Sequence, residues 1–396
     1  MSYPGRQWKT ARDLRRTPLH DRHLAAGAHF GQVYGFERPL YFHADGEPVL
    51  RFGEPAWHRR VETEVRAAHA DAAVFDQSTF GKILVTGSGA EAFLDRVCAN
   101  DMTRAPGRAI YTPMLNERGG YAADLTALRI AADEYLLYVG TGAIQRDLAW
   151  LRRQLREDEA VTLSDVTERH AVLALTGPRA AEIAAALGGG AKNPLGRFCH
   201  AEAEVAGVKV LAVRLSYVGE SGWEFTCPAV SAPVLWDAFV AGGATPAGLL
   251  AQTAMRIEMR HLAMGHDLDG DITPVEAGLD FVVKSRGHFI GAEALARRRV
   301  EGPAKRMVSI VLDDARAWPL GDEPVYAAGR LAGQATSAAF GHRLKRHVAL
   351  AYLNIEALVD ADGTEVELDI AGERFSGLAS LRPAWPPREI ADSQSP

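Results

Sequence analysis

Helix-like and strand-like segments alternate through the first 300 residues, but without the regular repeat of a parallel sheet. The stretch WHRRVETEVRAAHADAAVFDQS reads as a helix that leads into a buried strand, and AIYTPML and YAADLTALRIAADEYLLYVG read as antiparallel strands joined by glycine and polar turns. This order predicts an α+β fold. A chain of 396 residues also exceeds what one core organises, so we expect two or three domains.

The pattern changes after the charged linker ARRRVEGPAKR, beyond which short strands follow one another: MVSIVLDD, EPVYAAGRLAGQATSAAFG, HVALAYLN and GTEVELDIAGERFSG. They predict a small β domain, a barrel or Greek key, at 301–390. We expect a loop-rich lead-in at 1–55 and the α+β region at 56–300.

Charge and cysteine content limit the classes of partner. The net charge of -6 repels phosphate backbones, so we expect no nucleic-acid partner. Three cysteines, far apart and odd in number, indicate a reducing compartment. The polar, basic N-terminus and the lack of a long apolar run predict a cytoplasmic protein with no membrane partner, and an arginine-rich transit peptide is the weaker alternative.

Motifs of several common enzyme classes are missing: Cys-x-x-Cys, His-Glu-x-x-His, a Walker loop and Gly-x-Ser-x-Gly. We therefore expect no metal site and no serine hydrolase. His266 has acids nearby in MGHDLDGD, but an ordinary polar loop explains it. Gly140 and Gly142 are followed by Gln145 where a dinucleotide fingerprint needs a third glycine, so we read a turn.

Two short segments carry candidate chemistry. SYVGESGWEF places Glu220 and Glu224 around a turn with Tyr217 and Trp223 interleaved, which suits either a rim or a cavity for a nitrogen heterocycle. Asp101 follows a helix expected at 88–98, where a negative charge meets the unfavourable end of the helix dipole, so it is poorly placed as a cap. For Asp124 and Arg256, the sequence alone favours paired structural roles.

These segments, in this order, resemble the glycine cleavage T-protein family of aminomethyltransferases: AND, YTPMLNERGGYAADLT, SYVGESGWEF, MGHDLDGDITPVEAGLDFVVK and FIGAEAL. The lead-in LRRTPLHDRHLAAGAHFGQVYGFERPLYF and the C-terminal run WPLGDEPVYAAGRLAGQATSAAFGHRLKRHVALAYL are more similar to the folate-binding half of dimethylglycine and sarcosine dehydrogenases and oxidases. In that comparison 1–55 corresponds to the inter-domain region, and we expect the flavin-binding half to be absent.

The resemblance implies a three-domain, cloverleaf-like fold with two interleaved α+β domains, a small C-terminal β-barrel and tetrahydrofolate as cofactor. It implies that Asp101 is catalytic and that Glu224 binds the pterin edge. The full set of cofactor-binding residues it implies is Tyr111, Tyr217, Glu224, Arg256, Phe80 and Asn116. Some positions depart from the family pattern: Gln252 and Thr253 replace an Arg-Asp pair, and Ala292 replaces a lysine.

The same resemblance implies a tetrahydrofolate-dependent transferase acting on a small methylated substrate. A separate flavin dehydrogenase subunit would oxidise an N-methyl amine to an iminium, whose one-carbon unit gives 5,10-methylenetetrahydrofolate. Asp101 would stabilise positive charge and relay protons. One alternative is a stand-alone O-, S- or N-demethylase that gives 5-methyltetrahydrofolate. Another is a non-catalytic folate-binding protein, similar to the branch linked to iron–sulfur maturation, whose Lys-Gly-Cys-Tyr-like motif is missing here.

Overall fold

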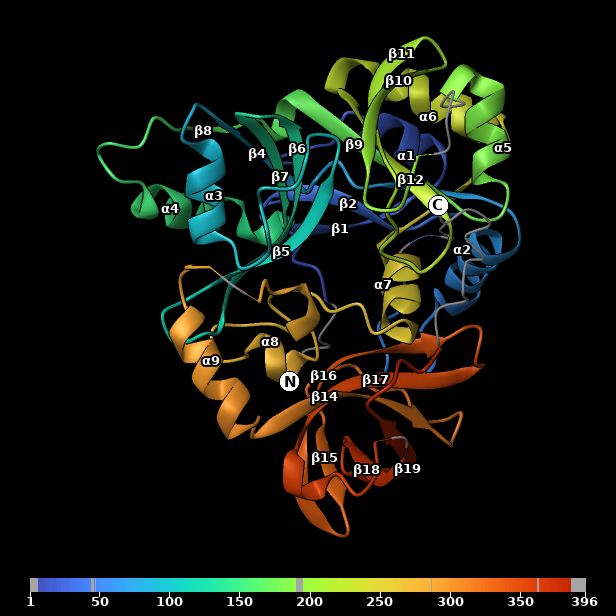
Figure 1. The fold of residues 1–396 in the computed structure, drawn as a ribbon. Helices are drawn as coiled ribbons and strands as arrows, with labels where there is room; N and C mark the ends of the chain where they lie inside the picture. The colour runs from blue at the N-terminus through green and yellow to red at the C-terminus, as the bar shows by residue number, and fades with distance from the viewer. Residues whose placement is uncertain are drawn as a thin grey trace.

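A computed structural model describes residues 6–43, 46, 48–189, 195–285, 287–361 and 363–385 of the chain. Residues 1–5 of the expected lead-in and residues 386–390 of the expected barrel domain lie outside the described ranges. Figure 1 shows three lobes, of which two contain open sheets and lie side by side, while the third is a β-barrel below them. The mixed helix and sheet content agrees with the predicted α+β class.

The first lobe is a five-stranded sheet in the order β5-β6-β7-β4-β8, with the bounds Ala109–Leu115, Tyr121–Ala131, Glu134–Val139, Gly81–Thr86 and Thr162–Asp165. Its strand pairs are antiparallel. Side chains of β6 alternate between buried and half-buried over most of the strand, as the period of two requires. Two helices close the lobe, α3 (Ala90–Val97) and α4 (Ile144–Gln154), and their apolar faces join the same core.

The second lobe is a six-stranded sheet in the order β10-β11-β12-β9-β3-β13, with the bounds His200–Val205, Val208–Val213, Gly222–Pro228, His170–Thr176, Ala73–Asp76 and Thr245–Ala247. Only the β13–β3 pair among these is parallel. The helices α5 (Ala180–Ala184) and α6 (Ala232–Ala241) pack on it. The strand expected to continue through SYVG ends at Val213, because the ladder with β12 stops there and Gly219 turns the chain with φ of 80°.

The third lobe is a closed six-stranded barrel in the order β14-β17-β16-β15-β18-β19. Its strands are Lys305–Leu312, Arg346–Asn354, Arg330–Gly341, Pro324–Ala327, Thr364–Ile370 and Glu373–Ser380. Closure pairs every strand on both sides, which leaves no exposed sheet edge. Inward-facing apolar side chains fill the interior. The prediction of a small C-terminal β-barrel is confirmed.

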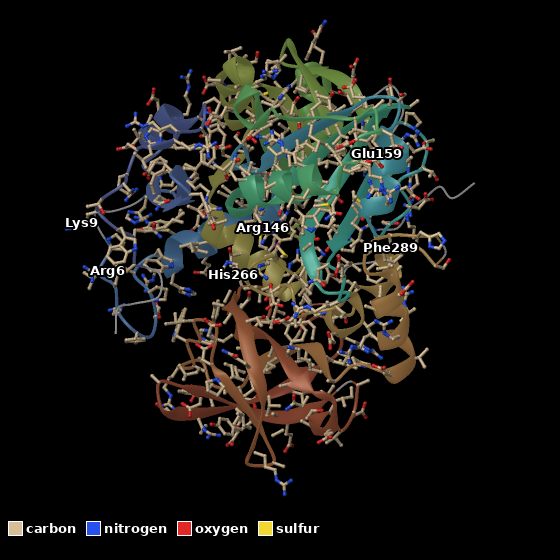
Figure 2. The ribbon with its side chains drawn as sticks, turned by 90° about the vertical axis from the view of Figure 1, so that its left-hand side faces the viewer. Arg6, Lys9, Arg146, Glu159, His266 and Phe289 are labelled. Atoms are coloured by element: carbon tan, nitrogen blue, oxygen red, sulfur yellow. The ribbon has the colours of Figure 1, made fainter. Side chains whose placement is uncertain are left out.

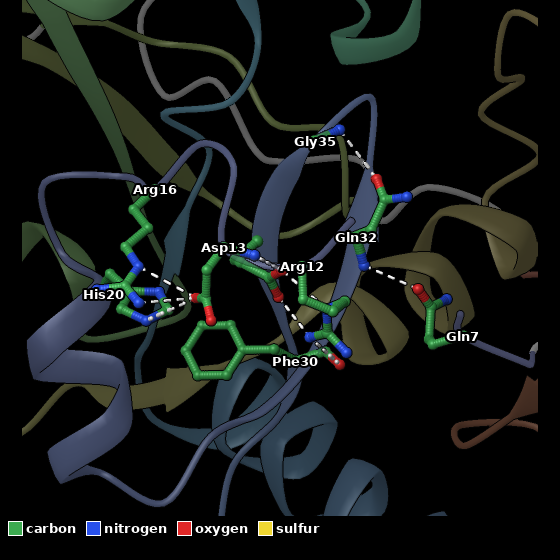
Figure 3. A network of polar contacts seen from close by, with 9 residues as sticks. Gln7, Arg12, Asp13, Arg16, His20, Phe30, Gln32 and Gly35 are labelled. Carbon is green, nitrogen blue, oxygen red and sulfur yellow. Dashed lines mark hydrogen bonds and ion pairs between the residues drawn. The ribbon is translucent and has the colours of Figure 1, made fainter. Parts of the chain in front are cut away.

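The lead-in is structured and tied down by polar contacts. It contains α1 (His20–Ala25) and the hairpin of β1 (His29–Val33) and β2 (Phe36–Tyr41). Figure 3 shows Arg12 beside this hairpin, where its Nε donates a hydrogen bond to Glu37 over 2.8 Å. The backbone N–H of Gln32 donates to Gln7 over 2.8 Å. These bonds hold the segment before α1 against β1 and β2.

Four further helices connect the lobes: α2 (His58–Ala70), α7 (Leu249–Glu258), α8 (Pro274–Ala277) and α9 (Ala292–Glu301). Helix α7 packs against α2, β2 and β16, so it touches the lead-in and the barrel as well as the upper lobes. In Figure 1 it stands at the centre of the molecule, above the barrel. Residues on α7 therefore lie where the lobes meet.

Candidate functional site

A cavity opens in the second lobe at the ends of β3, β9 and β12, beside the loop that follows β11. Its empty volume is about 250 Å³, counting its open mouth. The lining combines aliphatic and aromatic walls with a few polar groups, which is the usual composition of a small-molecule site. The lining residues are Phe75, Gln77, Ala174, Leu175, Thr176, Leu215, Ser216, Tyr217, Val218, Gly222, Trp223 and Glu224.

Glu224 lies on β12 and brings an acid into this cavity. Burial raises the pKa of Glu224 to about 7, and a hydrogen bond from Gln77 partly offsets that rise. Gln77 is only 4% exposed, and its Oε1 has no hydrogen-bond partner among the described residues. The Oγ of Ser216 is also buried without a partner there. Unpaired buried acceptors are costly, so this edge of the cavity suits a ligand that donates hydrogen bonds.

Tyr217 and Trp223 supply the aromatic part of the lining. The Tyr217 hydroxyl donates to the backbone oxygen of Leu262 over 3.2 Å, and its ring stacks on His261 with centroids 5.8 Å apart. Burial holds the pKa of Tyr217 well above its ordinary value, so the phenol stays neutral. The prediction of aromatic rings around an acid therefore describes the cavity, although Tyr217 reaches it from a loop.

Asp124, on β6 of the first lobe, is the most perturbed aspartate near this region. Burial raises its pKa to about 7, a hydrogen bond with the Tyr111 side chain lowers it, and the charge of Asp147 raises it further. Its Oδ1 is shielded from solvent and has no hydrogen-bond partner among the described residues. The charge of Asp124 also raises the pKa of Tyr217, so the carboxyl lies close to a residue that lines the cavity.

Tyr111 and Asp147 flank Asp124 on neighbouring elements. Tyr111 is on β5, and burial followed by the Asp124 charge keeps its pKa well above the ordinary value. Asp147, on α4, is 1% exposed, and burial raises its pKa to about 6 although Arg146 donates to it over 2.9 Å. Figure 2 shows Arg146 in the middle of the upper part of the molecule. Two desolvated acids thus share this region.

Asp101 has a different environment from Asp124. It lies between α3 and β5, and its Oδ1 accepts hydrogen bonds from the backbone N–H and the hydroxyl of Thr103 over 2.9 and 2.6 Å. The hydroxyl bond is the main reason that the pKa of Asp101 is lowered, against a smaller opposing effect of burial. This is the geometry of a carboxylate that caps a local turn. A catalytic role for Asp101 stays a prediction.

Arg256, on α7, is 5% exposed and makes its hydrogen bonds within the protein. It donates to Asp267 over 2.6 Å, to the Ser337 hydroxyl over 2.8 Å and to the backbone oxygen of His261 over 3.2 Å. Asp267 also accepts from Ser337 over 2.7 Å. Because Ser337 is on β16, the network fastens α7 to the barrel. Contact of Arg256 with a cofactor stays a prediction.

Asn116 and Phe80 occupy structural positions at the ends of strands. The Asn116 Oδ1 accepts from the backbone N–H groups of Arg118 and Gly120, and its Nδ2 donates to the Gly270 oxygen over 2.8 Å. These bonds shape the hairpin between β5 and β6. Phe80 is half-buried directly before β4, where its backbone N–H donates to the oxygen of Gln77 over 3.0 Å. Cofactor contact of both residues stays a prediction.

The sequence also raised His266 as a weak metal candidate. Figure 2 shows it at the level where the upper lobes meet the barrel, and its side chain is exposed. The neighbouring Asp267 is engaged with Arg256. Within the described ranges, no group of three or more His, Cys, Asp or Glu residues could hold a metal ion.

Two α+β lobes, a closed barrel and an acidic, aromatic cavity in the second lobe define the structural class of this protein. Comparison with known families identifies the family to which the chain belongs. The family model for the GCVT N-terminal domain matches residues 19–287, and the glycine cleavage T-protein C-terminal barrel domain matches 305–385. The chain belongs to the glycine cleavage T-protein family, as its motifs predicted.

Individual relatives agree with this assignment. The chain is 37% identical to an aminomethyltransferase of Geobacillus kaustophilus, covering 91% of this chain and 96% of that protein. It is 33% identical to the mitochondrial pyruvate dehydrogenase phosphatase regulatory subunit of Mus musculus, covering 97% of this chain but only 47% of the mouse protein. The crystal structure of glycine cleavage system aminomethyltransferase T from Bartonella henselae matches with a TM-score of 0.83, at 26% identity, over 95% and 99% of the two chains.

Among the described helices, none is long and apolar enough to cross a membrane.

Proposed function

We propose that this chain is a tetrahydrofolate-dependent one-carbon transferase that takes its carbon from an N-methyl amine. Membership of the T-protein family and the aminomethyltransferase relatives support the reaction class. The observation that carries the proposal is the pair of desolvated carboxyls, Glu224 and Asp124, whose pKa values are both raised to about 7. Glu224 lines the cavity, and strongly perturbed acids of this kind are typical of a functional site.

The polar groups of the cavity fit a reduced pterin. Its amidine-like edge carries N–H donors, and Glu224 offers a carboxylate that accepts two parallel hydrogen bonds. Gln77 would add Oε1 as a further acceptor while its amide holds Glu224 in place. Tyr217 and Trp223 would cover the ring faces and exclude water. When bound, tetrahydrofolate supplies a ring nitrogen that accepts the one-carbon unit.

We propose that Asp101 is the catalytic carboxylate, as the family resemblance implies, and that Asp124 is a second carboxylate that assists the chemistry. Asp124 has an unpaired buried oxygen and a pKa near working pH, which suits a group that stabilises developing positive charge and moves a proton at Oδ1. Tyr111 would orient that carboxyl through its hydroxyl. Asp101 is half-buried and has a lowered pKa, so it stays ionised and suits stabilisation of positive charge while Thr103 fixes the orientation of its carboxylate.

The donor is, in this proposal, a small N-methylated compound oxidised to an iminium by a separate flavin dehydrogenase, with 5,10-methylenetetrahydrofolate as product. Asp101, assisted by Asp124, would stabilise the positive charge of the donor. Three free cysteines, two of them buried, suit a reducing compartment, and we propose a cytoplasmic location. No feature of the described chain calls for nucleic acid.

The test uses N,N-dimethylglycine with ¹³C-labelled methyl groups, tetrahydrofolate and a dimethylglycine-oxidising flavoprotein as the stoichiometric electron acceptor in a single anaerobic turnover. We expect labelled methylenetetrahydrofolate to form faster with this chain than in a reaction without it, which measures the spontaneous rate, and more slowly with the Asp124→Asn variant than with wild type. Label in 5-methyltetrahydrofolate without flavoprotein would identify a stand-alone demethylase instead. Equal rates with and without the chain would contradict the proposed transfer.

A further inference from the structure

Arg38, on β2, is a half-buried cation that makes no ion pair with the described residues. Its Nε is shielded from solvent and has no hydrogen-bond partner among them. Burial lowers the pKa of Arg38 to about 10. A guanidinium nitrogen that is shielded from water and unpaired is costly, because a buried donor is tolerated best with a partner.

The position of Arg38 on β2 sets the direction in which it can bind. Alternation along the strand places Phe36, Arg38 and Leu40 on one face. Phe36 packs in the core of the first lobe. Leu40 packs against a different cluster that contains Phe75 and Val218, both of which line the cavity. Arg38 therefore lies between the first lobe and the wall of the cavity.

Helix α7 presents a second unpaired donor toward the same strand. At its start, a Cβ on Gly248 would lie 2.3 Å from the backbone oxygen of Leu40, so this face of the helix abuts β2. Gln252 follows one helical turn later on that face. It is 7% exposed, and its Nε2 has no partner among the described residues. Two desolvated donors thus face one junction without an acceptor.

We infer that Arg38, supported by Gln252, forms a carboxylate-binding subsite at the border of the cavity. The planar guanidinium fork pairs with a carboxylate through two parallel hydrogen bonds, and the Gln252 amide adds a third donor. The inference rests on the proposed function, in which two ligands carry carboxylates: the glutamyl tail of tetrahydrofolate and an N-methylated amino acid. The subsite would make carboxylate-bearing ligands bind better than their neutral analogues.

Anaerobic calorimetry with the Arg38→Met variant tests this inference. The ligands form two pairs, tetrahydrofolate with 6-methyltetrahydropterin, and N,N-dimethylglycine with N,N-dimethylethanolamine. We expect Arg38→Met to weaken the binding of at least one ligand that carries a carboxylate by about ten- to hundredfold, since a hydrogen bond to a charged group is lost. The affinity for both neutral analogues should stay unchanged. Arg306→Met is the matched control, because Arg306 also has a buried, unpaired Nε but is on β14 of the barrel.

The two ligand pairs separate the sources of the carboxylate. Weaker tetrahydrofolate binding assigns the subsite to the glutamyl tail, and weaker dimethylglycine binding assigns it to the carbon donor. If wild type binds tetrahydrofolate and Arg38→Met binds every ligand equally well, the inference is overturned. A wild-type chain that binds no folate would contradict the proposed function instead. Should thermal unfolding show that Arg38→Met does not fold, Gln252→Leu provides the same comparison, with an expected loss of a few-fold.

Discussion

Replacement of Asp124 by asparagine removes an acid that we propose assists the chemistry, while the side chain keeps nearly the same size. Removing one preorganised polar group from a transition-state site costs about 10² to 10³ in rate. We therefore expect the Asp124→Asn variant to lose about 10² to 10³ in kcat/KM for one-carbon transfer. Binding of tetrahydrofolate should change little, because Glu224 and Gln77 provide the acceptors for the pterin edge.

The magnitude of the pKa shift gives a second, independent expectation. The pKa of Asp124 rises from 3.8 to about 7 on folding. This shift lowers the free energy of unfolding at pH 8 by at most about 4 kcal/mol. Because the folded pKa is the higher one, the folded state holds the proton between pH 4 and 7, and stability falls as pH rises through that window. Asparagine cannot ionise, so the variant should be the more stable protein at pH 8 and should lose that advantage near pH 4.

The assay follows initial rates from pH 5.5 to 9 and denaturant unfolding at pH 4 and pH 8. At saturating tetrahydrofolate, where ionisation of Glu224 no longer limits binding, we expect kcat of wild type to rise with an apparent pKa near 7 as the Asp124 carboxylate ionises, and for Asp124→Asn a low kcat without that step. Asp101→Asn is the matched comparison, and we expect it to lose rate but to keep the pH step, because the pKa of Asp101 is lowered. A full rate in Asp124→Asn would refute the role of Asp124, and a full rate in Asp101→Asn would refute the role of Asp101.

Other parts of the site yield further predictions. Glu224→Gln should weaken tetrahydrofolate binding by about ten- to hundredfold in calorimetry, and wild-type affinity should increase as pH rises through about 7, where Glu224 ionises; unchanged affinity would remove Glu224 from the ligand edge. Arg256→Met leaves the buried Asp267 carboxylate without its cation, although Ser337 still donates to it, so it should lower the free energy of unfolding by about 3–5 kcal/mol; a variant that loses only cofactor affinity would instead support direct binding. Asn116→Ala should cost about 1–2 kcal/mol of stability through the hairpin, and a drop in tetrahydrofolate affinity at unchanged stability would contradict its structural role.

Much of the fold could be predicted from the sequence because local patterns agree with the final pairing. The run AIYTPML coincides with β5 (Ala109–Leu115), and the four apolar stretches after residue 301 became the barrel strands. Tyr217 is a counter-example, since its apolar context continued the strand pattern while the ladder had ended at Val213. The end of a strand is set by its partner, here β12, which the local sequence does not contain.

The candidate site was predictable in its residue types but less so in their roles. Acids and aromatic rings in SYVGESGWEF indicated the cavity, which Glu224, Tyr217 and Trp223 do line. The pKa of Asp124 depends on desolvation by segments distant in the sequence, whereas that of Asp101 depends mainly on the neighbouring Thr103, so spacing alone could not predict how the two environments differ. Gln77 and Arg38 were missed because their burial also depends on distant segments, although polar residues that interrupt the apolar context of AVFDQS and YGFERPLYF are a usable signal.

The measurement that tests the central claim most directly is anaerobic calorimetry of tetrahydrofolate binding to the wild-type chain beside Glu224→Gln. The account predicts saturable binding at one site per chain with a dissociation constant in the range of about 1 μM to 1 mM, weakened in the variant as described above. Absence of binding, or equal affinity in wild type and variant, would contradict a folate site in this cavity.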